Sequence, residues 1–266
     1  MSAQFGPHRW SAGHDRTPDT DRFRGARFHV ADLRGTRFVD CDLTGARIVD
    51  ATLVDVSVSG YVERLVVNGI DVTAYVESEL DRRHPERVQL RSVGSLSDFR
   101  ALWTTIESLW TETTRRAEQL AEPLLHQRVD EEWSFVETLR HLTFITDSWA
   151  SRAILDQENP FHPLALPQSA YNPTDAAALG MTLAATPTYA EALAARQSRQ
   201  AVVRDILTTT VDLNHPCSRA PAPGYPEGDR PVAECLYVLM EEEIAHHTYA
   251  SRDLTALERS LDTENR

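Results

Sequence analysis

The strongest constraint on the fold is a five-residue repeat near the start of the chain. The positions two residues before each large apolar residue of this repeat are almost all small, as at Ala26, Ala46 and Ala51. Helices repeat every 3.6 residues and strands every two, so neither has this period. A square solenoid fits, because one large and one small side chain per face can point inward. The large apolar positions are Phe23, Phe28, Leu33, Phe38, Leu43, Ile48, Leu53 and Val58.

This segment resembles the pentapeptide-repeat family, and its units ADLRG and CDLTG match the pattern of that family. The resemblance implies a short, right-handed β-solenoid over residues 21–60, with about two coils. Some members imitate DNA through their shape and acidity. The segment here is short and rich in arginine, so we expect a packed solenoid with no chemistry of its own.

Composition excludes several classes of function. The net charge of −13 argues against binding to a nucleic-acid backbone. No apolar run approaches the roughly 18 residues of a membrane span, and the first residues lack the apolar core of a signal peptide. We therefore expect no membrane partner and a cytoplasmic location. The three cysteines, Cys41, Cys217 and Cys235, are far apart in sequence and predict neither a disulfide framework nor a cysteine zinc motif.

The chain divides into four segments by composition. Residues 1–20 are polar and aperiodic, which predicts a disordered tail. Residues 21–60 are the repeat, and residues 61–92 form a connecting segment. In that connection, Asn68-Gly69 between short apolar runs predicts a hairpin turn, and Pro85 ends a short helix. Residues 93–262 are predicted to form a helical domain.

Four long helices are predicted in this last segment, so the fold is mainly α. Two begin with capping boxes, at Ser95 and Ser134, and a third is predicted to start at Thr186-Pro187. The fourth follows Pro231. Long, proline-rich connections at 156–185 and 208–229 suit a four-helix bundle with crossover links and are candidates to cover a site.

The last helix carries a polar pair within an apolar face. Glu243 and His247 are one turn apart among residues that repeat at helical spacing, and such a pair can bind a metal ion. Glu242 and His246 have the same spacing, but their face looks more polar and is expected to be solvated. The apolar members of the first face are Leu236, Met240, Ala250, Leu254 and Leu257.

His141 on the second helix points toward the same bundle core, so the predicted metal ligands are His141, Glu243 and His247. Two nitrogens and one carboxylate oxygen suit zinc with an open coordination position, and also nickel, iron or manganese. In the alternative interpretation, His141 is a core histidine and the other two residues pair with Arg or Asp groups of another helix. No general base can be identified from the sequence.

The segments EEWSFVETLRHL and EEEIAHHTYASRDLTAL resemble the DinB-like superfamily, which includes the mycothiol-dependent maleylpyruvate isomerases, over about residues 95–260. In that family a tryptophan-serine pair precedes the first metal ligand, and Trp133, Ser134 and His141 match it. Many members have His-x-x-x-His on the last helix. Here Glu243 takes the first position, as in the maleylpyruvate isomerases.

This resemblance implies a divalent-metal-dependent S-transferase or isomerase, in which a low-molecular-weight thiol such as mycothiol or bacillithiol reacts with a small electrophile. All 27 basic residues are arginine, which fits an actinobacterial source and favours mycothiol. Related bundles often dimerise, so a homodimer is possible. Two alternatives stay open: hydrolysis by a metal-bound water, and a non-catalytic metal-binding or protein-interaction scaffold, which the fused repeat favours.

Overall fold

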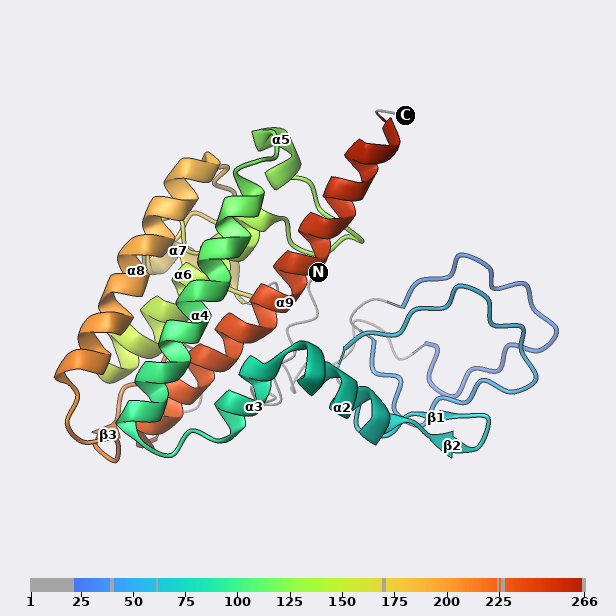
Figure 1. Cartoon of the computed structure of the whole chain (residues 1–266), viewed down its shortest axis with the longest axis horizontal. Helices are drawn as coiled ribbons and strands as arrows, with labels where there is room; N and C mark the ends of the chain where they lie inside the picture. The colour runs from blue at the N-terminus through green and yellow to red at the C-terminus, as the bar shows by residue number, and fades with distance from the viewer. Residues whose placement is uncertain are drawn as a thin grey trace.

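The structure is a computed structural model that describes residues 22–38, 41–60, 62–168, 171–223, 225 and 228–264. The predicted disordered tail, residues 1–20, lies outside these ranges. The described chain is mainly helical, as predicted, and its helices gather on one side of the repeat segment (Figure 1).

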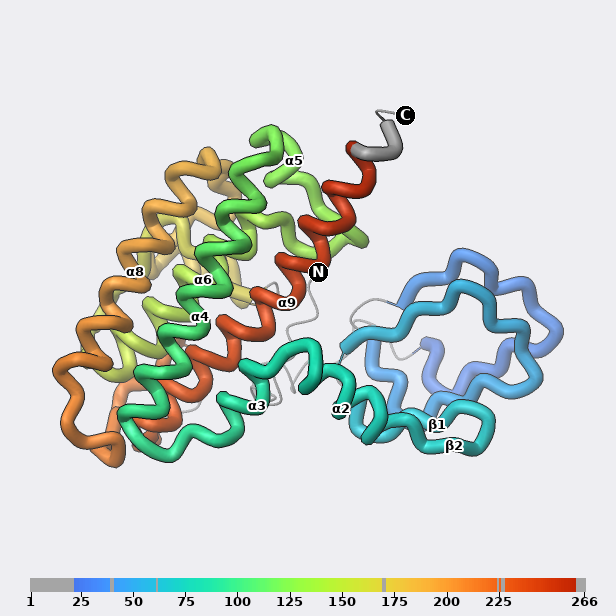
Figure 2. Tube along the Cα trace, in the orientation of Figure 1, coloured from blue at the N-terminus to red at the C-terminus, as the bar shows by residue number. Residues whose placement is uncertain are grey.

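Four long helices form the bundle. Helix α4 (Leu96–Ala117) packs against α9 (Val232–Glu264), and α9 packs against α6 (Phe135–Thr146). Helix α6 packs in turn against α8 (Tyr189–Thr209), and α8 also contacts α4, so the four helices enclose a common core. The trace in Figure 2 shows these helices running side by side. A π-helix, η1 (Asp147–Ile154), continues α6.

The helix starts follow local capping chemistry. Ser95 and Ser134 each accept a hydrogen bond from the backbone of the residue three positions on, and both predicted capping boxes are confirmed. The third helix begins later than predicted, at Tyr189. Its cap is Thr188, whose hydroxyl accepts from the Glu191 N–H at 3.3 Å. Pro187 therefore precedes the helix instead of opening it.

The connections carry short elements. Strands β1 (Val66–Val67) and β2 (Ile70–Asp71) form the predicted hairpin, with Asn68 at φ 49° in its turn. The other elements are α2 (Thr73–Arg83), α3 (Pro85–Arg91), α5 (Glu122–Leu125), α7 (Pro173–Ala178), β3 (Pro216–Cys217) and β4 (Arg230–Pro231). Helix α3 packs against α4 and α9, and β3 pairs with β4 beside the start of α9.

The core lies between the four long helices. Leu102 of α4, Leu142 of α6 and Leu239 of α9 are fully buried there. Burial of one such side chain stabilises the fold by about 1.5–3 kcal/mol. Among the described residues, no helix is both long enough and apolar enough to cross a lipid bilayer.

The repeat segment keeps its five-residue period in the backbone. Residues with positive φ, in the left-handed backbone conformation, recur at multiples of five positions: Gly25, Val30, Gly35, Gly45, Asp50 and Asp55. Backbone hydrogen bonds close turns at Ala26, Thr36 and Ala46. The large apolar residues, such as Phe23 and Ile48 at 63% and 71% exposure, are not packed inward. The described residues therefore show a series of regular turns, and the predicted β-solenoid is not shown.

Candidate metal centre

Three ligand-type side chains meet in the bundle between α6 and α9. His141, Glu242 and His246 each offer one ligand atom, and the three atoms lie within 4.8 Å of one another. The Nε2 atoms of His141 and His246 are 3.8 and 3.2 Å from Glu242 Oε2. All three residues are buried. Two imidazole nitrogens and a carboxylate oxygen at this spacing suit a divalent metal ion.

The protonation of the cluster suits ligation. Burial lowers the pKa of His141, so its ring is neutral and a nitrogen lone pair is available. Burial alone would raise the pKa of Glu242, but the contacts with the imidazoles, of which His246 is the nearer, outweigh it and lower that pKa. Glu242 is therefore an anion at neutral pH, which a cation can bind without first displacing a proton.

The neighbouring loop fixes the orientation of His141. Its Nδ1 lies 2.9 Å from the Leu166 carbonyl oxygen, so Nδ1–H donates there and Nε2 faces Glu242. Arg140 holds the same loop: its guanidinium donates to the carbonyl oxygens of Leu164, Thr182 and Ala185 at 2.8–3.0 Å. Since a partner on the second ring nitrogen sets the tautomer of a metal-binding histidine, this loop prepares His141 for ligation.

Trp133 covers the two histidines. Its ring centroid is 4.4 Å from that of His141 and 5.8 Å from that of His246, and it stacks on His246 at an interplanar angle of 21°. The ring centroid of Phe144 lies 6.2 Å from that of His141. Aromatic rings thus pack against both imidazoles, which restricts their rotation and keeps water away.

Glu243, one of the sequence-predicted ligands, has another partner. Its carboxylate, which is fully buried, forms an ion pair with Arg196 of α8. Burial raises the pKa of Glu243, and the arginine opposes this shift. Arg196 is itself only 2% exposed. Glu243 therefore pairs with Arg196 inside the bundle and does not contact His141.

His247, the other sequence-predicted ligand on α9, lies at the interface with α4. Its Nε2 is 2.8 Å from the Thr113 hydroxyl and 3.3 Å from that of Ser251, and its ring meets Trp110 edge-on. Burial lowers its pKa. This histidine faces a hydroxyl cluster and not the three-residue cluster.

The structure thus brings together His141 with Glu242 and His246, the alternative register, and not with Glu243 and His247. The expectation that the Glu242 face is solvated is wrong, because α6 and η1 cover it. Glu-x-x-x-His occurs twice in the segment EEEIAHH, so the sequence did carry the signal for this second register.

A π-helix follows directly after the first ligand helix. Within η1, Asp147 is 1% exposed, and its carboxylate accepts from Arg199 Nε at 2.9 Å and from the His162 backbone N–H at 2.8 Å. Burial raises the pKa of Asp147 to about 6 against the opposing effect of Arg199. This carboxylate therefore joins η1, α8 and the loop that leads to Leu166. π-Helical turns are frequent at functional sites.

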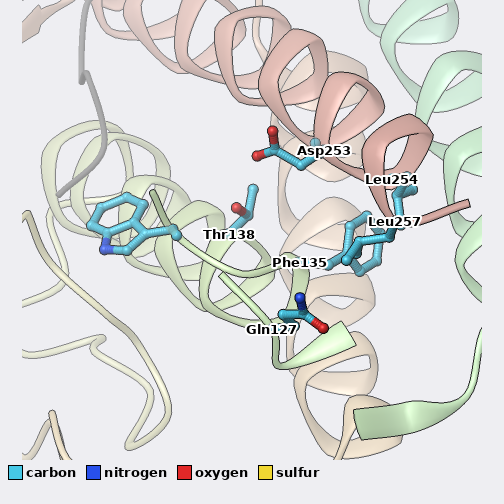
Figure 3. Close-up of a pocket in the computed structure, with 8 residues that line it drawn as sticks. Gln127, Phe135, Thr138, Asp253, Leu254 and Leu257 are labelled. Carbon is cyan, nitrogen blue, oxygen red and sulfur yellow. The ribbon is translucent and has the colours of Figure 1, made fainter. Parts of the chain in front are cut away.

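The two long connections meet over the bundle. Gln168 Nε2 donates to the Tyr225 hydroxyl at 3.0 Å, and the Tyr225 ring contacts Trp149 of η1 edge-on. Trp133 also lines a small pocket, drawn in Figure 3, together with Phe135, Thr138 and Asp253. This pocket holds about 10 Å³. This is the space of a single water molecule.

Comparison with known families gives two matches. A family model described as the DinB superfamily matches residues 105–250, which is more than half of the chain. A second model, for pentapeptide repeats, matches residues 22–60 in eight copies. No curated protein and no solved structure matches the chain.

Proposed function

The chain belongs to the DinB superfamily, and from this membership we propose that His141, Glu242 and His246 bind a divalent metal ion. Three buried ligand atoms within 4.8 Å of one another support this assignment most directly. Zinc suits two imidazoles and one carboxylate best, and nickel, iron and manganese also accept this donor set. The proposal replaces Glu243 and His247, which pair elsewhere, as ligands.

We further propose that the site serves a low-molecular-weight thiol, of the mycothiol type, in S-transfer to a small electrophile or in its isomerisation. A divalent ion held by three protein ligands lowers the pKa of a bound thiol and stabilises its thiolate. The chain supplies the surroundings: Leu166 orients His141, Trp133 packs on both imidazoles, and Glu242 contributes the negative charge. An enclosed aromatic wall favours a reaction from which water is excluded.

Adjacent histidines provide a matched test of the metal site. His246→Ala removes a proposed ligand, whereas His247→Ala removes a buried histidine one position along the same helix. The protein is purified without chelator, and bound metal is measured by plasma mass spectrometry. We expect near-stoichiometric metal in the wild type and in His247→Ala, and its loss in His246→Ala.

The reverse pattern, with metal lost only in His247→Ala, would assign the ligands to the other register. A wild type that neither retains metal nor takes up added zinc, nickel or manganese contradicts the whole proposal. For metal-loaded protein, thiol consumption is then measured with mycothiol and a panel of small electrophiles. Turnover that disappears in His246→Ala supports the transferase or isomerase function.

One observation favours a second, non-catalytic function as an interaction scaffold. The repeat segment exposes its large apolar residues, and contiguous exposed apolar surface commonly marks a protein-interaction site. In this case the metal ion would stabilise the bundle without turnover. Metal-loaded protein that is inactive with every thiol tested, but unfolds at lower temperature once the metal is removed, would support this function.

A further inference from the structure

Two cysteines that are far apart in sequence meet in the fold. Cys217 lies in β3 and Cys235 in the first turns of α9. Both belong to the same buried core, and a hydrogen bond joins their side chains. They are 4% and 0% exposed. The third cysteine, Cys41, is exposed in the repeat segment. The large separation of Cys217 and Cys235 in the sequence gave no indication of this contact.

The backbone around the pair is fixed by hydrogen bonds. Strand β3 pairs with β4, so that Cys217 lies opposite Arg230. The Val232 N–H donates to the His215 carbonyl oxygen at 3.1 Å, and the Ala233 N–H donates to that of Leu213 at 2.9 Å. These bonds hold the chain before Cys217 against the first turn of α9. The contact between the thiols is thus set by secondary structure rather than by a free loop.

We propose that Cys217 and Cys235 are a disulfide site that fastens the segment between them to α9. A peroxide supplies the oxidising equivalents: two thiols and one hydrogen peroxide give one S–S bond and two water molecules. One thiolate attacks the peroxide and becomes a sulfenic acid. The second thiol displaces the sulfenic oxygen as water. The product is uncharged and suits a buried position.

The environment sets the rate of this step. Burial raises the pKa of both thiols, so little thiolate is present at neutral pH. Oxidation is therefore slow at pH 7 and becomes faster as the pH rises. Close placement of the second thiol favours the disulfide over further oxidation of the first.

The segment that the disulfide would close lies over the bundle. It contains Tyr225, which accepts a hydrogen bond from Gln168 in the other long connection. It also contains Ala220, whose carbonyl oxygen accepts from Arg152 Nε at 3.0 Å. A covalent link at the base of this segment restricts the unfolded chain and limits opening of the segment, whether or not metal is bound.

The test uses the full chain with Cys41→Ser, which removes the exposed thiol. The protein is treated with hydrogen peroxide at pH 7 and pH 8.5, quenched, and analysed by intact mass spectrometry and non-reducing peptide mapping. We expect a mass loss of two hydrogen atoms, faster at the higher pH, a linked peptide containing Cys217 and Cys235, and reversal by dithiothreitol. Oxidation should raise the unfolding temperature by roughly 5–10 °C.

Cys41→Ser combined with Cys235→Ser is the matched control and should show neither the mass loss nor the thermal shift. If both thiols stay free to alkylation after treatment and unfolding, or if sulfinic acid forms in place of the linked peptide, the disulfide site is wrong. A disulfide that forms without a thermal shift would overturn the fastening role. None of these outcomes depends on metal binding.

Discussion

Glu242 and Glu243 are neighbours on α9 with different partners. Successive residues of an α-helix point about 100° apart. Glu242 faces His141 and His246, while Glu243 meets Arg196, which reaches α9 from α8. Since both carboxylates are buried, each needs a cationic or proton-donating partner of its own.

The Arg196–Glu243 pair gives a prediction for stability. Arg196→Met leaves the Glu243 carboxylate buried without its counter-charge, and breaking a buried pair in this way costs about 3–5 kcal/mol of unfolding free energy. Urea denaturation of the metal-free protein measures the loss. The double variant Arg196→Met/Glu243→Leu removes both charges and should recover most of it. A double variant as unstable as the single one contradicts the assignment.

Trp133 gives a prediction for metal affinity. Its ring packs on the two proposed histidine ligands, so Trp133→Ala frees both imidazoles to rotate. Loss of groups that orient metal ligands typically weakens binding about 10–100-fold. We expect that loss in a competition titration with a chromogenic chelator, and a smaller one for Trp133→Phe. Trp103→Phe, in the core of α4, is the control; equal affinities in all four proteins would exclude this role.

Periodicity in the sequence predicts which face of the last helix is buried, but not which polar pair meets His141. The apolar stripe through Glu243 and His247 is buried, as predicted. A stripe identifies one buried face, but α9 is covered by α4 on one side and by α6 and η1 on the other. Which of two polar pairs meets His141 depends on Arg196 and Thr113, and their positions come from the tertiary structure.

At the scale of elements, Asp147 joins η1 to α8 and to the connection that contains His162. Its buried carboxylate should make the stability of the folded chain depend on pH. Its pKa is raised to about 6 in the folded chain, compared with about 3.9 for an unperturbed aspartate. The folded state therefore binds more protons between these values, and stability falls as the pH rises through 6. At pH 7 the cost amounts to roughly 3 kcal/mol.

Asp147→Asn isolates this contribution, because the amide oxygen can still accept from the His162 N–H. Other groups also titrate between pH 4 and 7, so the informative quantity is the difference between wild type and variant. We expect the unfolding free energy of the wild type, relative to Asp147→Asn, to decrease from pH 4 to pH 7. A difference that is constant, or that increases, across this range would show that the Arg199 pair outweighs burial.

Most elements with local signals were predicted well, although the third helix begins later than Thr186-Pro187 indicated, and elements without such signals were missed. Capping boxes and tight turns are formed by residues close together in the chain, so they can be predicted from sequence. This holds for the boxes at Ser95 and Ser134 and for the Asn68-Gly69 turn. The π-helix at Asp147 has no such local signature. The contacts of Arg140 with three carbonyl groups of a distant connection are also set by the tertiary structure.

At the scale of the whole molecule, the repeat and the bundle are linked by few described contacts. One is the hydrogen bond from Arg37 Nη2 to the Asp130 carbonyl oxygen at 2.8 Å. We predict that a chain starting at residue 62 keeps the helical circular dichroism and the metal content of the full protein. Its unfolding temperature should change by less than about 4 °C, the effect of roughly 1 kcal/mol in a domain of this size. Loss of metal together with helicity would show that the repeat supports the bundle.

The two adjacent Glu-x-x-x-His pairs on α9 also determine what a one-residue deletion would do to the proposed metal site. Deleting one residue from the start of α9 would turn the helix so that Glu243 and His247 occupy the places of Glu242 and His246. The same shift would place Ile244 opposite Arg196, which would lose its counter-charge. The helix thus carries the same pair of ligand types in two adjacent registers. The deletion would not preserve the ion pair, because the next residue, Ile244, carries no charge. Arg196 therefore favours the observed rotation of the helix over the one that the deletion would produce.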